Sequence, residues 1–244
     1  MKISSKKREK IIRGILQAVY PGHCPVCDEI VRHGGENVCA ECMDKLKLLT
    51  PPYCMRCGKK ISEGEEYCGE CREKKHFFER GRALYEYGPA AESIYRFKYG
   101  GRREYAEFYG EQIAEYLGGF IRNTGAEGIV PIPLHRNRKR TRGYNQAELL
   151  AKAAGKRLGI PVYPKMLVRV KNTVPQKKLN PEERQNNLKR AFNMGQNDVK
   201  LKTIIVVDDI YTTGITIDEA ARVLKDAGAE KIYFVTLACG AGTA

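Results

Sequence analysis

The chain of 244 residues lacks any long uninterrupted apolar segment. A membrane-spanning helix needs roughly 18 or more consecutive apolar residues, so we expect no membrane span. Between Ile11 and Tyr20, apolar residues recur at helical spacing, but Arg13 and Gln17 interrupt the run that a secretory signal would require. We therefore predict a short amphipathic helix over residues 1–21 and a cytoplasmic protein.

Acidic residues are scarce in one part of the chain. Between Ile132 and Arg190 there are 16 Lys and Arg residues but only three Asp and Glu residues. This segment therefore carries a net charge of +13, out of +14 for the whole chain. Such a concentration predicts a polyanionic ligand, and both a diphosphate and a nucleic-acid backbone qualify.

Cysteine is abundant in one block. Eight of the nine cysteines form four pairs with the same spacing, namely Cys24/Cys27, Cys39/Cys42, Cys54/Cys57 and Cys68/Cys71. A two-residue gap lets both thiolates approach one ion from a tight turn, and two such pairs complete a tetrahedral site. We therefore predict a module over residues 22–79 that holds two structural Zn²⁺ ions.

Alternatives to zinc are weaker. A disulfide framework would require an oxidising compartment, and the sequence shows no secretion signal. The pairs also lack a thioredoxin-like context for redox chemistry. The spacing does not decide whether consecutive pairs share an ion or whether the arrangement is cross-braced. Three nearby histidines, His23, His33 and His76, are predicted to be ordinary surface residues.

The net charge of the cysteine module is slightly negative. Gly22 to Arg72 contains seven Lys and Arg residues against nine Asp and Glu residues. Non-specific nucleic-acid binding depends mainly on basic side chains that neutralise phosphates. The module is therefore predicted to be structural, or to contact other proteins.

A strand–turn–helix pattern near the C-terminus is the most informative motif. The apolar run Thr203 to Val207 predicts a buried strand, Asp208 and Asp209 stand at its end, and a Thr-Thr-Gly turn precedes a helical pattern over 217–227. Ligands of open α/β sheets bind beyond the carboxyl ends of strands, and helix N-termini bind phosphate. Paired carboxylates beside such a site suit two vicinal hydroxyls, Mg²⁺, or both. A sugar phosphate satisfies this description.

This motif resembles the phosphoribosyl-diphosphate (PRPP) signature of type I phosphoribosyltransferases. The resemblance implies that the two aspartates hold the ribose hydroxyls, that the turn wraps the 5-phosphate, and that Mg²⁺ accompanies PRPP. The expected PRPP-binding residues in the motif are Asp208, Asp209, Tyr211, Thr212, Thr213, Gly214, Ile215 and Thr216. The alternative is an ordinary strand–turn–helix with capping polar residues.

The basic segment contains a second strand–turn–helix pattern. We predict a strand over Ile129–Pro133, an arginine-rich turn over Leu134–Arg142 and a helix over Gly143–Leu158. Guanidinium groups at the end of a strand suit a diphosphate, because their planar donors match phosphate oxygens. A solvated loop and a nucleic-acid patch are the alternatives.

Several motifs in combination resemble the ComF family of competence proteins over nearly the whole chain. They are the cysteine pairs, Pro-Ile-Pro-Leu at 131–134, Arg-Gly-Tyr-Asn-Gln at 142–146, Tyr-Arg-Phe-Lys-Tyr-Gly at 95–100 and the PRPP signature. A spaced set adds Arg169, Thr173, Gln176, Leu179, Arg184, Asn187, Ala191 and Phe192. The resemblance implies an α/β fold over residues 80–244, with a mostly parallel type I phosphoribosyltransferase-like sheet flanked by helices, preceded by a double zinc ribbon.

The family resemblance also implies site residues. Arg140, Arg142, Arg169 and Arg184 are expected to be catalytic, and Lys98, Pro133 and Leu134 are expected to bind PRPP. The segment Lys171 to Arg184 is either a lid that closes over PRPP or a plain surface connection. Cys239 is predicted to be a small core residue.

Two functions remain open from the sequence. The first is transfer of phosphoribose from Mg²⁺-PRPP to a nitrogen acceptor, without a dedicated general base. The second is a non-catalytic accessory of DNA uptake that binds PRPP only as a ligand and binds single-stranded DNA through residues 132–190, with partners such as a DNA helicase. Bases would stack on aromatic residues near basic ones, and the candidates are Tyr95, Phe97, Tyr99, Tyr105, Phe108 and Tyr109.

Overall fold

The fold is described from a computed structural model. The residues that the structure describes are 22–31, 37–171, 191–195 and 199–240. The predicted helix over 1–21, most of the predicted lid and Arg184 therefore lie outside the described residues. Within the described residues, no helix is both long and apolar enough to cross a membrane.

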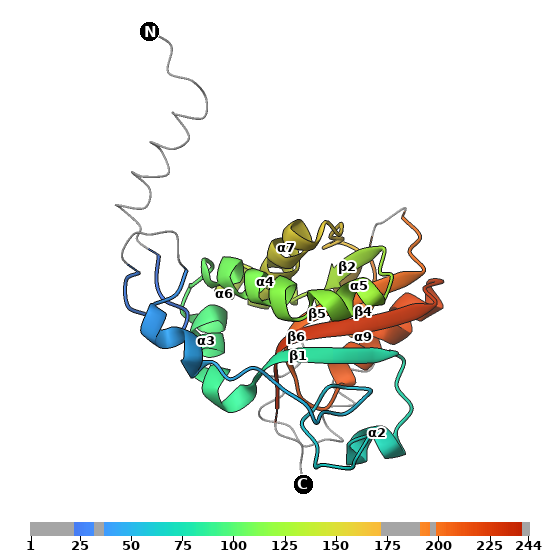
Figure 1. Ribbon diagram of the computed structural model, residues 1–244. Coiled ribbons are helices and arrows are strands. Elements are labelled where there is room, and N and C mark those ends of the chain that lie inside the picture. Colours follow the sequence, from blue (N-terminus) through green and yellow to red (C-terminus); the bar gives the residue numbers. More distant parts are fainter. Residues whose placement is uncertain (1–21, 32–36, 172–190, 196–198, 241–244) are drawn as a thin grey trace.

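A four-stranded parallel sheet forms the centre of the molecule (Figure 1). Its strand order is β1 (Arg80–Glu86), β6 (Lys231–Cys239), β5 (Thr203–Tyr211) and β2 (Gly128–Pro131). A separate antiparallel pair joins β3 (Leu167–Arg169) and β4 (Phe192–Met194). The predicted α/β class and the parallel sheet are confirmed.

Alternate residues of β5 face two different hydrophobic cores. Ile205 and Val207 join the core that contains α3 (Tyr87–Tyr99), α4 (Tyr105–Tyr116), α5 (Gly118–Asn123) and α7 (Gln146–Leu158). Ile204 and Val206 join the core that contains α9 (Ile215–Asp226). This alternation follows from the period of two in a strand, and it makes the sheet the middle of three layers.

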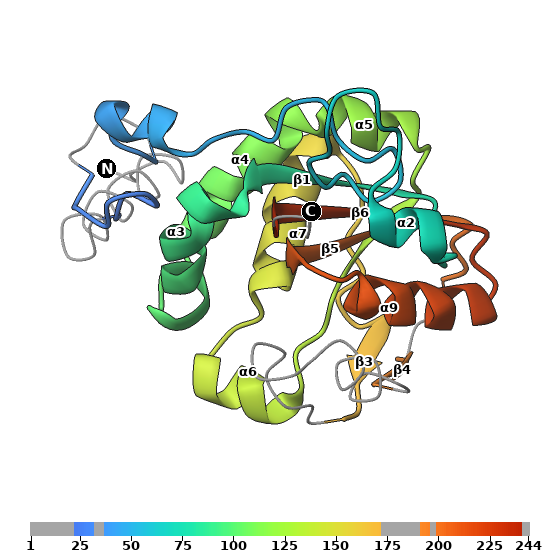
Figure 2. The same ribbon diagram turned by 90° about the horizontal axis from the view of Figure 1, so that it is seen from below.

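The two cysteine ribbons join different cores. Ribbon 1, residues 22–46, contributes Cys24 and Cys42 to the core of α3 and α4 and includes the short helix η1 (Ala40–Lys45). Ribbon 2, residues 50–79, contributes Cys54, Cys57 and Cys68 to the core of α9 and includes α2 (Gly69–Glu73). Figure 2 shows the two ribbons well separated, with ribbon 1 beside α3 and ribbon 2, which includes α2, beside α9.

The segment between the ribbons runs along the edge of the sheet. Leu49 N donates to Leu84 O at 2.9 Å, and Glu86 N donates to Lys47 O at 2.9 Å. These bonds satisfy backbone groups of β1, which would otherwise be an open edge strand.

The structure corrects several predicted element boundaries. Strand β5 continues through Asp208 and Asp209 to Tyr211, because β6 continues beside it and pairs Tyr211 with Cys239. The predicted arginine-rich turn is instead the helix α6 (Arg136–Arg142). His135 caps its start by accepting from Asn137 N, and Gly143 ends it with a φ of 80°. The predicted helix 143–158 therefore begins only at Gln146, after its own cap Asn145.

Candidate functional site

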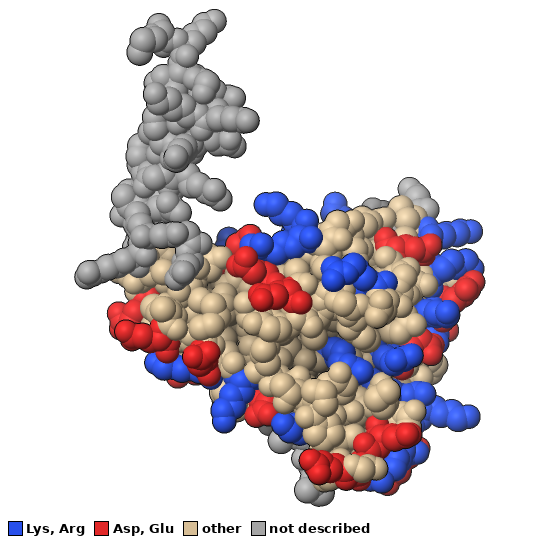
Figure 3. Space-filling view, viewed as in Figure 1, with Lys and Arg blue, Asp and Glu red and all other residues tan. Residues whose placement is uncertain are grey.

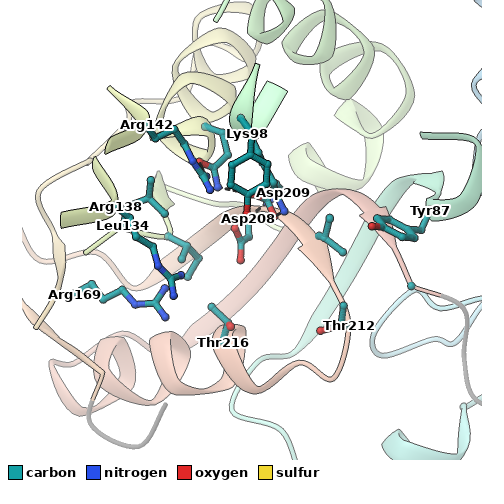
Figure 4. Close-up of a pocket in the computed structure, with 15 residues that line it drawn as sticks. Tyr87, Lys98, Leu134, Arg138, Arg142, Arg169, Asp208, Asp209, Thr212 and Thr216 are labelled. Carbon is teal, nitrogen blue, oxygen red and sulfur yellow. Dashed lines mark hydrogen bonds and ion pairs between the residues drawn. The ribbon is translucent and has the colours of Figure 1, made fainter. Parts of the chain in front are cut away.

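A cavity of about 370 Å³ lies at the carboxyl end of β5 (Figure 4). Its walls come from α3, the segment after β2, α6, α7, β3, β5 with the following turn, and the residue after β6. The lining residues are Tyr87, Lys98, Tyr99, Ile132, Leu134, Arg138, Arg142, Gln146, Arg169, Asp208, Asp209, Ile210, Thr212, Thr216 and Gly240. The sheet edge thus gathers residues from segments far apart in the sequence, as open α/β sheets do at their ligand sites.

Two adjacent carboxylates in the centre of this cavity have different surroundings. Asp209 is buried, its Oδ1 lies 2.8 Å from Lys98 Nζ, and its Oδ2 accepts a hydrogen bond from Gln146. Asp208 accepts from the backbone N of Asp209 at 2.8 Å. Burial and the neighbouring charge of Asp209 raise the pKa of Asp208 to about 7, although Lys98 and Arg169 oppose the shift. Asp209 is thus held in fixed pairs, while Asp208 remains available for a cation or a hydroxyl donor.

The turn after β5 forms one wall. Thr212 and Thr216 line the cavity (Figure 4). Gly214 caps α9 with a φ of 73°, a conformation that favours glycine, and makes no side-chain cap. The first amides of a helix have no intrahelical acceptors and can bind an anion.

Tyr211, Thr213, Gly214 and Ile215 were also expected to bind PRPP, but they do not line the cavity. Tyr211 is buried, and a Cβ at position 214 would collide with its hydroxyl. Tyr211 thus packs against Gly214 from the protein interior and supports the turn.

Three guanidinium groups form the opposite wall. Arg138, Arg142 and Arg169 line the cavity, and Arg138 and Arg169 point into it in Figure 4. Burial, together with the charge of Arg138, lowers the pKa of Arg169 to about 10. A site that brings cationic groups together in this way suits an anion with several charges, such as a diphosphate.

The arginines that line the cavity differ in one residue from the predicted set. Arg140 lies exposed on α6 and does not line the cavity, whereas Arg138 does. Arg138 and Arg142 are four residues apart, so in a helix they share a face that Arg140 does not. Sequence reasoning missed Arg138 because it treated this segment as a turn. Leu134 lines the cavity, and Pro133 is buried beside it without lining it.

The eight paired cysteines form two tetrads. Each tetrad combines two consecutive pairs, Cys24, Cys27, Cys39 and Cys42 in ribbon 1, and Cys54, Cys57, Cys68 and Cys71 in ribbon 2. The structure thus supports the sequential pairing over the cross-braced one. The Sγ atoms of Cys57 and Cys68 are 3.6 Å apart, and those of Cys27 and Cys39 are 3.8 Å apart. Zn–S bonds of about 2.3 Å in a tetrahedron give S–S edges of about 3.8 Å, so both tetrads fit Zn²⁺.

His76 corrects the prediction that the nearby histidines are ordinary surface residues. Its side chain is only 2% exposed and lies between Cys71 of ribbon 2 and Asp218 of α9. No periodicity signals this position, because the contact joins residues 142 positions apart. Ribbon 1 has a partly similar contact, in which His23 Nδ1 lies 3.1 Å from Arg102.

The aromatic residues expected to stack on bases separate into two groups. Phe97, Tyr105, Phe108 and Tyr109 are buried, which places them in the core. Tyr95 is 58% exposed, Tyr99 is 63% exposed, and their ring centroids are 5.0 Å apart. Only this pair, among the six candidates, offers ring faces to a ligand.

Two protein families match different parts of the chain. Residues 15–72 match the double zinc ribbon domain, and residues 145–243 match the phosphoribosyl transferase domain. These matches support the expected ribbons and the expected fold class.

Relatives match most of the chain. Competence protein F of Haemophilus influenzae is 30% identical over 226 residues, covering 88% of this chain and 95% of the relative. DNA utilization protein YhgH of Escherichia coli is 28% identical, covering 87% and 94%. Competence protein ComFC of Bacillus subtilis is 30% identical, covering 79% and 80%.

Proposed function

Since the chain belongs to the competence protein F family, with a double zinc ribbon ahead of a phosphoribosyltransferase domain, we propose that it binds Mg²⁺-PRPP and transfers phosphoribose to a nitrogen acceptor. The observation that carries this proposal is one cavity that combines a carboxylate pair, a threonine turn at a helix start and three arginines.

Each part of the cavity suits one part of PRPP. The amides and hydroxyls of the 212–216 turn suit the 5-phosphate. The carboxylate of Asp208 suits the ribose hydroxyls, and Asp209, fixed by Lys98 and Gln146, keeps the pair in place. The guanidinium groups of Arg138, Arg142 and Arg169 suit the diphosphate.

The donor set also fits Mg²⁺. Carboxylate oxygens are ligands that this ion prefers, together with phosphate oxygens of a substrate. Asp208 offers such oxygens within the cavity. When bound, the ion would neutralise part of the charge of the diphosphate.

The proposed reaction is a displacement at ribose C1. The lone pair of the acceptor nitrogen forms the new bond to C1 while the bond from C1 to the diphosphate oxygen breaks, and the diphosphate leaves with the bonding electrons. The three arginines stabilise the negative charge on the departing group. Their fixed placement and that of the turn hold the reacting groups in position.

Calorimetry with Mg²⁺-PRPP tests the binding step. Asp208→Asn combined with Asp209→Asn keeps the shape and removes the charge, and charge-assisted hydrogen bonds contribute roughly 1.5–3 kcal/mol each. We expect the double variant to bind at least about a hundredfold more weakly than the unaltered protein. Asp226→Asn, at the exposed far end of α9, is the matched control and should bind normally. Unchanged affinity in a folded double variant would contradict the proposal.

Single-stranded DNA binding is a second candidate, favoured by the exposed pair Tyr95 and Tyr99. Arg142 lies 4.7 Å from the Tyr99 ring, so the pair combines stacking faces with positive charge. The relatives' names refer to competence and DNA utilization. The face seen in Figure 3 intersperses acidic and basic groups and shows no continuous basic track.

Fluorescence anisotropy with a labelled oligonucleotide tests this second candidate. Tyr95→Ala with Tyr99→Ala should weaken binding about tenfold, since base stacking contributes roughly 1–3 kcal/mol per base. Tyr116→Ala, another exposed tyrosine, is the control. Replacing Arg136, Lys139 and Arg140 by alanine should flatten the salt dependence. Equal binding by all variants would rule this surface out.

A further inference from the structure

Ribbon 2 is joined to the first turn of α9 by a short chain of polar contacts. His76 Nδ1 lies 2.6 Å from Asp218 Oδ2, and Phe77 N donates to Asp218 Oδ1 at 2.9 Å. The other ring nitrogen of His76, Nε2, lies 3.5 Å from Cys71 Sγ of the second tetrad. The imidazole thus connects a cysteine of the tetrad to a carboxylate on the helix that follows the phosphate-binding turn.

Ribbon 2 also contacts Tyr211, the residue beneath that turn. The ring of Phe78 meets Tyr211 edge-on at 6.3 Å, and Lys59 Nζ lies 5.7 Å from the Tyr211 ring centroid. Lys59 is itself buried and held by Glu70 at 2.5 Å. Two independent contacts therefore reach both ends of the turn, Tyr211 before it and Asp218 after it.

We propose that ribbon 2 positions the 212–216 turn for phosphate, with His76 and Asp218 as positioning residues. This inference rests on the proposed function, because it assigns a role in PRPP binding. The second tetrad fixes Cys71, Cys71 orients His76, and His76 holds Asp218. Asp218 N donates to Gly214 O at 2.8 Å, so holding Asp218 also holds the glycine that shapes the turn.

The physical reason is that anion binding by helix amides depends on their placement. Helix amides that bind one phosphate together lose this joint effect when the first turn of the helix shifts or frays. Helix ends fray readily, and Gly214 offers no side-chain cap to this one. The His76–Asp218 contact supplies the missing restraint from outside the helix.

Ribbon 1 provides a built-in comparison, because it contacts a different part of the fold. Asp28 binds Arg102 at 2.7 Å and accepts from the Tyr105 hydroxyl at 2.5 Å, and Arg96 donates to Val26 O. These contacts hold α3 and the start of α4. Loosening them should leave the amides of the 212–216 turn unchanged.

Two variants with matched controls test the inference. His76→Ala removes the imidazole from the link while keeping all eight cysteines and the bond from Phe77 N to Asp218, and His23→Ala is the equivalent change in ribbon 1. Asp218→Asn changes the link from the other side, and Asp226→Asn is the same change at the other end of α9. Elemental analysis should find two zinc ions in each variant, which separates loss of the link from loss of metal.

Hydrogen exchange without PRPP is the first readout. The amides of 218–221 are the first of α9 with acceptors inside the helix, as in the bond from Asp218 N to Gly214 O, so their exchange reports fraying of the first turn. We expect these amides to exchange faster in His76→Ala and Asp218→Asn, with ribbon 1 and α4 unchanged in both. A merely structural destabilisation would instead speed exchange throughout the sheet and its helices. Equal exchange at 218–221 in His76→Ala and His23→Ala would overturn the inference whether or not PRPP binds.

Calorimetry with Mg²⁺-PRPP is the second readout. The two link variants should bind about tenfold more weakly than their controls, within the range typical of coupling between sites. Failure of the unaltered protein to bind PRPP would overturn the proposed function, while the exchange result would still decide this inference. Equal affinities in variants and controls, in a protein that does bind PRPP, would overturn the positioning role.

Discussion

The two ribbons have the same cysteine spacing but occupy different environments. In ribbon 2, Cys54, Cys57 and Cys68 are buried and share a core with α9, whereas in ribbon 1 Cys27 is exposed and Cys39 is half-buried. Ribbon 1 meets α3 and the start of α4, and ribbon 2 meets Tyr211 and Asp218 on either side of the 212–216 turn. The comparison teaches that one motif, repeated within one module, can pack into two different cores and so contact different parts of the fold.

We expect the largest difference between the ribbons, in both melting temperature and PRPP affinity, when one zinc is removed at a time. Cys57→Ser should lose one zinc, lower the melting temperature by about 10 °C or more, and abolish PRPP binding, because ribbon 2 shares the core of α9 and contacts Tyr211 and Asp218 on both sides of the 212–216 turn. Cys27→Ser should also lose one zinc, with a smaller change in melting temperature and PRPP affinity within about threefold of normal.

Elemental analysis, thermal unfolding and calorimetry on the same samples check this prediction. Equal losses of stability and affinity in the two variants would mean that the ribbons act as one unit, and the comparison would fail.

A pH titration of PRPP affinity tests the Asp208–Asp209 pair, which lies between the part of the cavity that ribbon 1 supports and the part that ribbon 2 supports. Lys98 on the ribbon 1 side and the turn on the ribbon 2 side both border the Asp208–Asp209 pair. Because the pKa of Asp208 is raised to about 7 by burial and by Asp209, its carboxylate is protonated as the pH falls. Affinity for Mg²⁺-PRPP should therefore fall about tenfold from pH 8 to pH 6.

Asp208→Asn is the control for this titration, because the ligand's own phosphates titrate in both proteins. The variant should bind weakly at every pH, and its profile should keep only the part that belongs to the ligand. Identical profiles in the two proteins would show that Asp208 does not titrate in the site.

The smallest expected effect is a gain of stability. A carboxyl whose pKa is higher in the folded than in the unfolded state destabilises the fold increasingly as the pH rises from about 4 to about 7. Without PRPP, Asp208→Asn should therefore raise the melting temperature at pH 8 by about 2–4 °C, and by less at pH 4. Asp226→Asn should show no such gain. A loss of stability at pH 8 would mean that Asp208 has a structural role.

The sequence predicted the features that depend on local spacing. The paired cysteines, the buried apolar strand and the turn with Gly214 each require particular residues at fixed offsets, so a single segment reveals them. The zinc pairing was not decidable, because the gaps between successive pairs are nearly equal and only the packed ribbons distinguish the choices.

Features that depend on distant contacts were missed. His76 contacts Asp218 across 142 positions, and no local pattern announces this. The end of β5 was placed too early, because polar side chains at 208 and 209 mask a backbone ladder that β6 maintains. The arginine-rich segment was predicted to be a turn, because the prediction rested on its charges and not on the helix caps His135 and Gly143. The roles of Arg184 and of the predicted lid lie outside the described residues.

Hydrogen exchange with and without saturating Mg²⁺-PRPP tests the central claim most directly, because it locates the ligand on the chain. PRPP binding at the carboxyl end of β5 predicts slower exchange at residues 208–217, with ribbon 1 unchanged. Slower exchange elsewhere, with 208–217 unaffected, would contradict a PRPP site at this cavity.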